Sequence, residues 1–302
     1  MKALATVTNE QYIEGTEVLF YSFLQENPGF AGDLIVIHED LSTSLQQRLL
    51  SLFPITFIEV SSTLKSRLSD LVENQPRYAN RYQRFWSLEV FRLQGYDSVL
   101  FMDSDILCRK NMMGIFELNT GFAAAPDLGF YEGIGRNPIT FEKVKQQSNG
   151  QELPIQTFNA GVLFLRPKRL SEDTFDTLLE LTSPKALEQV TSGHTDQYVL
   201  NRHFSKQVHW LASSYNFLVK KKGQPEHDDL KHPREAHVWH YIRHPKPWKL
   251  KKLVKRNLTK HPEMLFWKEW HSVYRKVLRA KMKKGKAPQY IPHWILSYVF
   301  AR

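Results

Sequence analysis

The first half of the chain alternates short apolar runs with segments of helical periodicity. Apolar runs at residues 3–8, 34–37, 55–60 and 98–102 predict buried strands, and residues 12–25 and 42–52 have the spacing of amphipathic helices. Strands that alternate with helices form a mostly parallel sheet with helices on both faces. Ligands of such sheets bind beyond the carboxyl ends of the strands. We therefore expect the chemistry of this chain to follow Thr8, Met102 and Pro126.

Positive charge is concentrated in the last part of the chain. The net charge is +10, but residues 249–302 hold 15 Lys and Arg against two acidic residues, so residues 1–248 are slightly acidic. Basic, aromatic, helix-compatible segments are typical of proteins on anionic membrane surfaces, where each cation contributes about 1 kcal/mol. We predict that residues 249–302 form a helical tail that binds such a surface. The aromatic residues of this tail are Phe266, Trp267, Trp270, Tyr274, Tyr290, Trp294, Tyr298 and Phe300.

Two alternatives for the tail remain. Its aromatic residues pack on the preceding domain while the cations stay in solvent, or the segment binds single-stranded nucleic acid. Nucleic acid is the least favoured of the three. The single cysteine, Cys108, leaves no disulfide within the chain, and no run of 18 apolar residues predicts a membrane-spanning helix. With no signal peptide before the first strand, we expect a cytoplasmic protein, peripheral at the inner face of the membrane.

Two carboxylates follow the strand at residues 98–102. Asp103 and Asp105 stand two residues apart, directly after an apolar run. Two neighbouring carboxylates are costly to bury without a cation, and hard oxygen ligands suit Mg²⁺ or Mn²⁺ bound to a diphosphate. The alternative is a strand-end turn with solvated acids. The segment His240-Tyr-Ile-Arg-His-Pro-Lys-Pro-Trp248 offers a third ligand in His240 and two phosphate-binding cations in Arg243 and Lys246, or is simply a basic loop.

Two further segments combine polar and small residues. Phe158-Asn-Ala-Gly-Val-Leu-Phe-Leu165 opens a very apolar strand with an amide, Asn159, and small residues that allow a ligand close to the backbone. Gly193-His-Thr-Asp-Gln197 predicts a helix start with Thr195 as its cap. A turn before a core strand and an ordinary helix cap are the respective alternatives. No glycine-rich phosphate loop is present, which argues against dinucleotide dehydrogenases and ATPases.

In their order along the chain, the four segments resemble the motifs of glycosyltransferase family 8, over roughly residues 3–248. The opening Thr-Val-Thr-Asn-Glu-Gln-Tyr12 and Ala124-Ala-Pro-Asp127 are also similar to segments of that family. The resemblance implies an α/β, single-domain, GT-A-like fold in residues 1–248, with a mostly parallel mixed sheet. It implies a retaining hexosyltransferase that takes a sugar from a UDP-sugar donor with Mn²⁺, or Mg²⁺, as cofactor. The implied acceptor is a glycan, a glycolipid or a protein-linked sugar.

The resemblance also assigns roles to residues. Asp103, Asp105 and His240 would bind the metal, and Tyr12 would stack on the base that Thr8 and Asn9 hold. Arg84 would contact the donor phosphate or sugar, Ser104 would lie near the ribose, and Lys246 would hold the diphosphate. The donor-sugar pocket would be lined by Asp127, Asn159, Ala160, Asp196 and Gln197.

One position departs from the family pattern. Arg243 stands where the motif His-x-x-Gly-x-x-Lys has glycine. The arginine either adds a phosphate contact or obstructs the site in a degenerate, nucleotide-sugar-binding relative. A glycogenin-like protein or glucan glucosyltransferase is a variant of the active reading. Retention of the anomeric configuration by double displacement needs a nucleophile, for which Asp196 is the nearest carboxylate candidate and Gln197 a poor one. The other route is front-face attack by the acceptor, which we favour.

Overall fold

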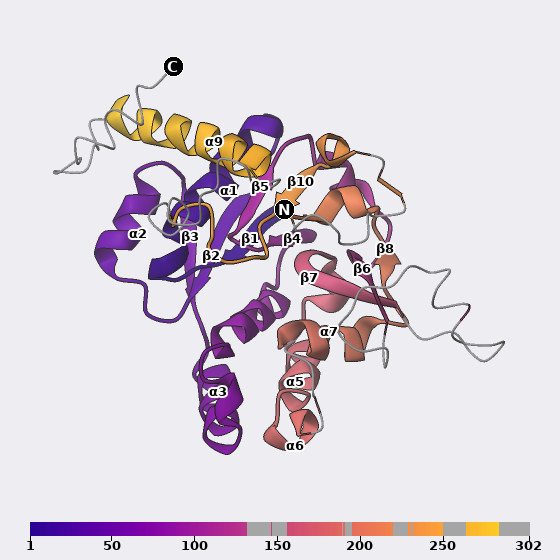
Figure 1. Cartoon of the computed structure of the whole chain (residues 1–302). Helices are drawn as coiled ribbons and strands as arrows, with labels where there is room; N and C mark the ends of the chain where they lie inside the picture. The colour runs from indigo at the N-terminus through magenta and orange to yellow at the C-terminus, as the bar shows by residue number, and fades with distance from the viewer. Residues whose placement is uncertain are drawn as a thin grey trace.

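The computed structural model describes residues 1–131, 146, 156–188, 190, 195–219, 229–230, 232–249 and 264–283. A seven-stranded sheet runs in the order β3-β2-β1-β4-β7-β6-β8 through the centre of the molecule (Figure 1). Only β7 runs antiparallel to its neighbours, so the sheet is mostly parallel. The strands are β1 (Lys2–Val7), β2 (Asp33–His38), β3 (Ile55–Glu59), β4 (Ser98–Met102), β6 (Phe122–Tyr131), β7 (Gln156–Leu165) and β8 (His209–Trp210).

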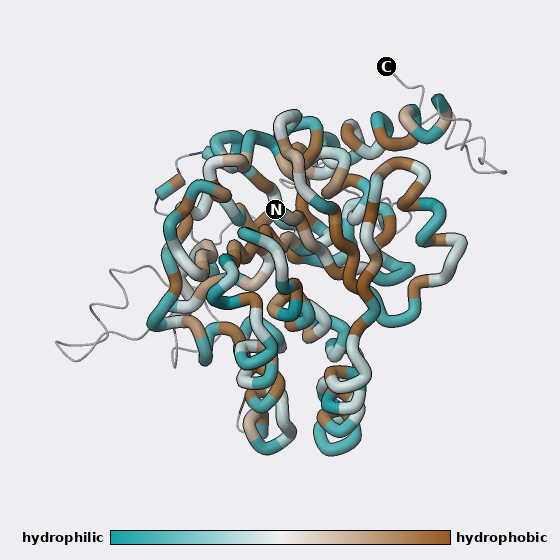
Figure 2. Tube along the Cα trace, turned by 180° about the vertical axis from the view of Figure 1, so that it is seen from behind, coloured by the Kyte–Doolittle hydropathy of each residue, from teal (hydrophilic) through white to brown (hydrophobic). Residues whose placement is uncertain are grey.

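Both faces of this sheet are covered. Side chains alternate along each strand, so that Leu4 and Leu100 join one apolar cluster while Ala5 and Phe101 join another. Figure 2 shows hydrophobic residues concentrated along the central strands. The first cluster includes residues of α1 (Ile13–Glu26) and α2 (Thr43–Leu50). The second includes residues of α3 (Ser62–Asn74), the 3-10 helix η3 (Tyr82–Arg92), α5 (Glu172–Glu180), α6 (Pro184–Leu187) and α7 (Asp196–Phe204).

The predicted fold class is confirmed. The expected strands at residues 3–8, 34–37, 55–60 and 98–102 correspond to β1, β2, β3 and β4. The apolar run at residues 161–165 predicts a strand that starts at Gly161. Strand β7 instead begins five residues earlier, at Gln156, because Phe158 and Ala160 also face the apolar interior. Among the residues with a described structure, no helix is long and apolar enough to cross a membrane.

A second, three-stranded sheet lies beside the first. Strand β10 (Val238–His240) pairs antiparallel with β5 (Ile106–Cys108) and parallel with β9 (Phe217–Leu218). This pairing brings a segment from far along the chain against the turn that follows β4. The small sheet therefore connects the downstream basic motif to the two carboxylates.

Helix α9 (Met264–Lys283) packs against α1 and the small sheet. Trp270 is fully buried, and Phe266 and Trp267 are each 9% exposed in a cluster with Trp239 and Tyr241. The expectation that these three aromatic side chains of the tail face a membrane is therefore wrong, because each is covered by the protein itself. Tyr274 is partly buried and stacks on Trp270 with ring centroids 5.1 Å apart. The other four tail aromatic residues lie outside the described residues.

Two ion pairs fix α9 in place. Lys281 is buried and pairs with Glu17 of α1, which is fully buried and also accepts two hydrogen bonds from Arg48 (2.7 and 2.9 Å). At the other end of the helix, Arg109 donates to Glu269 (2.7 Å). These contacts make α9 part of the packed body of the protein.

Candidate active site

The two carboxylates lie at the carboxyl edge of the large sheet. Strands β1 and β4 are parallel neighbours, with Ala5 opposite Phe101, so Thr8 and Asp103 leave the sheet at the same edge. The backbone N–H of Asp103 donates to the Gly161 carbonyl (2.8 Å), and Ile106 N–H donates back to the Asp103 carbonyl (3.2 Å). This closed turn connects β4 to β5. Thr8 and Asp103 thus lie beyond the carboxyl ends of their strands, where the sequence led us to expect the site.

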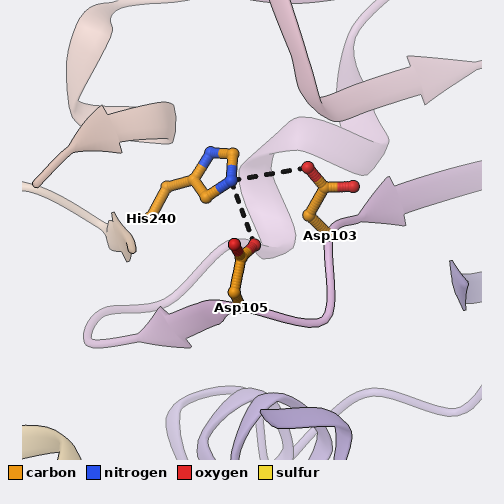
Figure 3. A group of neighbouring side chains, drawn as sticks. All are labelled: Asp103, Asp105 and His240. Carbon is orange, nitrogen blue, oxygen red and sulfur yellow. Dashed lines mark ion pairs between the residues drawn. The ribbon is translucent and has the colours of Figure 1, made fainter. Parts of the chain in front are cut away.

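His240 reaches the carboxylates from β10. In the antiparallel pair of β10 and β5, His240 lies opposite Ile106, and Tyr241 N–H donates to the Asp105 carbonyl (2.9 Å). Nε2 of His240 lies 3.1 Å from Oδ1 of Asp105 and 3.4 Å from Oδ2 of Asp103 (Figure 3). The ligand atoms of the three residues lie within 4.8 Å of one another. His240 therefore meets the two carboxylates with which it was expected to act, although it follows them by more than 130 positions.

Electrostatics tie this cluster together. Burial opposes protonation of His240, but the charge of Asp105 and hydrogen bonds to Asp103 and Asp105 outweigh it and raise the pKa of His240 to about 9. Burial alone would raise the pKa of Asp105, yet the charges of Lys246 and His240 hold it well below its usual range. The Asp103 side chain is 41% exposed, whereas those of Asp105 and His240 are nearly buried. The cluster is therefore open to solvent on the side of Asp103.

Lys246 lies against the same carboxylate. Its buried ammonium group pairs with Oδ2 of Asp105 and donates to the Tyr241 carbonyl (2.7 Å). It also sits 5.8 Å from the ring centroid of Tyr12. The structure thus brings the predicted phosphate-binding lysine to the predicted metal ligands. Arg243, half-buried, lies in the segment between His240 and Lys246.

Residues expected to hold the base and ribose gather at the start of α1. Thr8 is buried and its hydroxyl accepts a hydrogen bond from Thr16 (2.7 Å). Asn9 caps the turn by accepting from Gln11 N–H (2.9 Å) and donates to Gln83 (2.7 Å). Burial and the charges of Asp105 and Asp103 raise the pKa of Tyr12, which keeps it a neutral phenol. Arg84 is close enough for its charge to act on both Tyr12 and Asp196.

Trp248 packs beside Tyr12, and no role was assigned to it from the sequence. Its ring packs edge-on against Tyr12 (5.3 Å between centroids), and its Nε1–H donates to the Gln11 carbonyl (2.8 Å). Gly15 lets α1 lie close to Ser104 and Trp248: a Cβ at Gly15 would lie 2.3 Å from the carbonyl oxygen of Ser104 and 2.9 Å from the Trp248 ring. Ser104, buried, therefore sits directly under the first turn of α1.

The expected donor-sugar residues form a hydrogen-bonded group. Asn159 Nδ2 donates to Asp127 (3.3 Å) and to Gln197 Oε1 (3.1 Å), and Gln197 Nε2 donates to Asp127 (2.8 Å). The Ala160 N–H also points at Gln197 Oε1 (3.4 Å). Asp127 and Asn159 are buried. The structure thus joins four of the five predicted residues directly.

Asp196, the fifth, begins α7. Its two oxygens accept hydrogen bonds from Ser87 and Thr195 (2.9 Å each). Burial and the negative charge of Asp103 raise the pKa of Asp196 to about 6. Thr195 occupies the predicted cap position, but its hydroxyl donates to this carboxylate instead of accepting from the backbone. Gly193 and His194 of the same motif lie outside the described residues.

One buried amide of this site has no counterpart in the predicted set. Asn216 is fully buried and bridges His240 Nδ1 (2.9 Å) and Asn159 Oδ1 (2.8 Å). It stands in Ser-Tyr-Asn-Phe, a stretch without a recognisable pattern, and reaches His240 only because β9 pairs with β10. No feature of the sequence pointed to it.

Comparison with known proteins agrees with this geometry. The family model described as glycosyl transferase family 8 matches residues 3–252. Galactinol synthase 6 of Arabidopsis thaliana is 24% identical over 67% of this chain and 61% of its own length. Glycogenin of Neurospora crassa is 21% identical over 91% of this chain and 35% of its own length. The glycosyltransferase GlyE of Streptococcus pneumoniae is 31% identical over 50% and 34%. This chain thus spans about one to two thirds of these relatives.

Solved structures share the fold. The galactosyltransferase LgtC, in complex with donor and acceptor sugar analogs, superposes with a TM-score of 0.62 and 18% identity, covering 98% of this chain and 99% of LgtC. GlyE superposes with a TM-score of 0.59 and 20% identity, covering 95% and 66%. At such identities the likeness establishes the fold, which is GT-A-like. The matched family model, which covers both carboxylates, His240 and Lys246, shows that this chain belongs to glycosyl transferase family 8, a family of nucleotide-sugar transferases.

Proposed function

We propose that this protein is a retaining, Mn²⁺-dependent hexosyltransferase that takes its sugar from a UDP-sugar. The observation that carries the proposal is the convergence of Asp103, Asp105 and His240 at the edge of the sheet, beside Tyr12 and Lys246. The proposed acceptor is a glycan, a glycolipid or a protein-linked sugar. A glucan or protein acceptor of the kind suggested by the name glycogenin is the variant.

The three side chains suit a divalent cation. Two carboxylate oxygens and one imidazole nitrogen form a mixed oxygen and nitrogen set, which favours Mn²⁺ over the all-oxygen surroundings that Mg²⁺ prefers. Asp103 and Asp105 would hold the ion from the turn after β4, and His240 from β10. A bound Mn²⁺ supplies positive charge next to a departing diphosphate.

The donor is proposed to lie along the edge formed by β1 and β4. Tyr12 would face the uracil, with Thr8 and Asn9 near the base and ribose and Ser104 below the ribose. Lys246, which pairs with Asp105 in the free protein, would turn its charge to the diphosphate when a cation neutralises that carboxylate. Arg84 would add charge on the opposite side. The sugar would then reach the group of Asp127, Asn159, Ala160 and Gln197.

We propose front-face transfer. The acceptor hydroxyl would bond to the anomeric carbon on the face that the diphosphate leaves, and its proton would pass to a departing diphosphate oxygen. Lys246 stabilises the charge of the leaving group without proton transfer. In support, the amide of Gln197 is held at both ends, and both oxygens of Asp196 accept hydrogen bonds, which weakens either as a nucleophile. Double displacement through Asp196 is the competing route.

A donor hydrolysis and transfer assay tests the metal. We expect release of UDP from UDP-glucose or UDP-galactose to require Mn²⁺, and Asp103→Asn or Asp105→Asn to reduce it at least about 100-fold, because charge next to the diphosphate is lost. Asp176→Asn, which changes an exposed carboxylate of α5, is the matched control and should leave release unchanged. Full release in excess chelator would refute the metal assignment.

Arg243 separates the enzyme from the alternative, a binding protein without catalysis. If its guanidinium contacts the diphosphate, Arg243→Ala should weaken UDP binding by about 1.5–3 kcal/mol, the usual range for a charged hydrogen bond. Titration calorimetry with UDP and Mn²⁺ measures this. Should Arg243→Gly instead increase turnover, the arginine obstructs the site and the degenerate alternative is favoured.

A further inference from the structure

The buried amide of Asn216 lies directly behind the imidazole of His240. Asn216 ends the 3-10 helix Ser213–Asn216, immediately before β9. Leu218 of β9 pairs with His240, and Val219 N–H donates to the His240 carbonyl (2.8 Å), so the backbone fixes Asn216 beside the ring. The Asn216 side chain contacts the ring nitrogen that faces away from the carboxylates, Nδ1, at 2.9 Å.

Hydrogen-bond polarity can be followed through this chain of groups from one fixed point. The Gly161 backbone N–H can only donate, and it donates to Asn159 at 2.9 Å, so the receiving atom is the oxygen, Oδ1. The Asn216 atom that meets the same oxygen at 2.8 Å must then be its NH₂ group. Its remaining atom, the carbonyl oxygen, faces His240 and can only accept. Nδ1 of His240 must therefore carry a hydrogen.

The far side of Asn159 agrees with this assignment. Its NH₂ group faces acceptors, the Asp127 carboxylate and Gln197 Oε1. Turning the Asn159 amide over would place its oxygen against a carboxylate and its NH₂ group against the Gly161 N–H. The polarity of Asn159, and through it that of Asn216, is thus determined at both ends.

From this arrangement we infer that Asn216 is a positioning residue for the metal site. It keeps a hydrogen on Nδ1 of His240 and fixes the ring, so that Nε2, which meets Asp103 and Asp105 in the free protein, can exchange its hydrogen for a cation held by these carboxylates. The inference rests on the proposed metal-dependent function. A histidine that binds a metal through one ring nitrogen commonly donates from the other to a fixed acceptor, and loss of that acceptor costs about 10–100-fold in metal affinity. Gly161 leaves room for the ring, since a Cβ there would lie 2.2 Å from Cε1 of His240.

The test measures the Mn²⁺ concentration that gives half-maximal UDP binding, by titration calorimetry on the full chain. Asn216→Ala should require about 10–100-fold more Mn²⁺ than the wild-type protein while binding UDP with similar affinity once Mn²⁺ is saturating. Asn216→Asp keeps an oxygen acceptor for Nδ1–H but sets its second oxygen against Oδ1 of Asn159, so it should recover most of the Mn²⁺ affinity lost in Asn216→Ala while lowering the unfolding temperature. A merely structural asparagine would show neither the separation of the two affinities nor the rescue by aspartate.

Asn27 provides the matched control. It is also an almost fully buried asparagine. Its side-chain amide donates to the Phe23 carbonyl (2.7 Å) and accepts from Met112 N–H (2.6 Å), and neither residue belongs to the candidate site. Asn27→Ala should lower the unfolding temperature but leave the Mn²⁺ requirement unchanged. An unchanged Mn²⁺ requirement in Asn216→Ala, or a requirement in Asn216→Asp as high as in Asn216→Ala, would overturn the positioning role alone. UDP binding by the wild type that needs no Mn²⁺ would overturn the proposed metal site and this inference with it.

Discussion

A Cβ atom added to Gly161 would collide with the ring of His240 and lie 3.0 Å from Oδ1 of Asn159. The glycine of the Phe-Asn-Ala-Gly-Val segment therefore makes room for His240, a proposed metal ligand that comes from another sheet. From the sequence, the small residues of this segment indicated a close approach of some ligand. The group that approaches Gly161 is instead a side chain of the protein.

Gly161→Ala should accordingly destabilise the protein. The ring of His240 is buried and cannot move into solvent, so we expect a loss of about 1–3 kcal/mol in the free energy of unfolding, measured with urea. Gly114→Ala is the control, because a Cβ at Gly114 meets no atom within 4 Å, and it should change stability by less than about 1 kcal/mol. Equal effects of the two substitutions would contradict the packing role.

The carboxyl group of Asp196 makes stability depend on pH. Its pKa is raised to about 6 in the folded protein, above that of an unfolded aspartate, so the folded state binds more protons between about pH 4 and pH 6. Stability due to this group is present at the low end of that window and is lost as the pH rises through about 6. Relative to Asp196→Asn, the wild type should lose at most about 1.4 kcal/mol per pH unit there. Urea unfolding in chelator at pH 4.5 and pH 7 measures the stability of the wild type and of Asp196→Asn. If the stability difference between these two proteins is the same at both pH values, the raised pKa of Asp196 is refuted.

The sequence pointed to the motif residues of the candidate site but not to the residues that pack behind them. Asp103, Asp105, Asn159 and Gln197 stand in short patterns that follow predicted strands or open a predicted helix, and such patterns are local. Asn216 is not part of a pattern, since its role depends on which strand lies next to β10. A contact of that kind is decided by the pairing of strands distant in sequence, which a single sequence does not reveal.

Among the elements, α9 differs most from its expected role. Its basic and aromatic composition indicated a membrane surface, but three of its aromatic side chains fill the space between α1 and the small sheet. Composition alone does not distinguish a helix that lies on a membrane from a helix that packs on a protein domain, because each needs one apolar face. The three strands β5, β9 and β10 were not predicted, as two or three residues are too few for a periodicity to show.

The ion pair between Lys281 and Glu17 is expected to hold α9 to α1. Lys281→Met leaves Glu17 buried with Arg48 as its remaining partner, so we expect the free energy of unfolding to fall by about 1–3 kcal/mol, less than for a fully orphaned charge. Lys283→Met removes an exposed charge of the same helix and should change stability by less than about 0.5 kcal/mol. Urea unfolding of both variants decides; a silent Lys281→Met would show that the pair does not anchor the helix.

Over the whole molecule, charge remains unevenly distributed. The basic surplus lies in residues 249–302, and Lys268, Lys276 and Lys283 of α9 are exposed. Binding to an anionic surface stays a prediction. It rests on these charges alone, because α9 buries three of the aromatic residues of the tail. The mostly parallel large sheet, by contrast, followed directly from the alternation of strands and helices, because that alternation leaves few other folds.

Vesicle sedimentation tests the charge. The full chain should sediment with vesicles containing phosphatidylserine at low salt and be released as salt rises, because exposed charges are screened beyond about 8 Å at physiological ionic strength. Replacing Lys268, Lys276 and Lys283 by Glu should weaken sedimentation without changing the unfolding temperature by more than a few degrees. Neutral phosphatidylcholine vesicles are the control. Absence of sedimentation at low salt would end the membrane proposal.

Helix α9 lies beyond residue 252, where the family match ends, yet Trp270 contacts Trp248 and Trp248 contacts Tyr12. Two ring contacts therefore separate the C-terminal segment from the residue proposed to face the uracil. Chimeras that exchange C-terminal segments between relatives cannot be joined at the end of the shared region alone. If α9 of a relative replaces this helix, the residues that it contacts, at the positions of Glu17 and Trp248, have to be exchanged together with it. Since Trp248 contacts Tyr12, such an exchange would also alter the surroundings of the proposed uracil site.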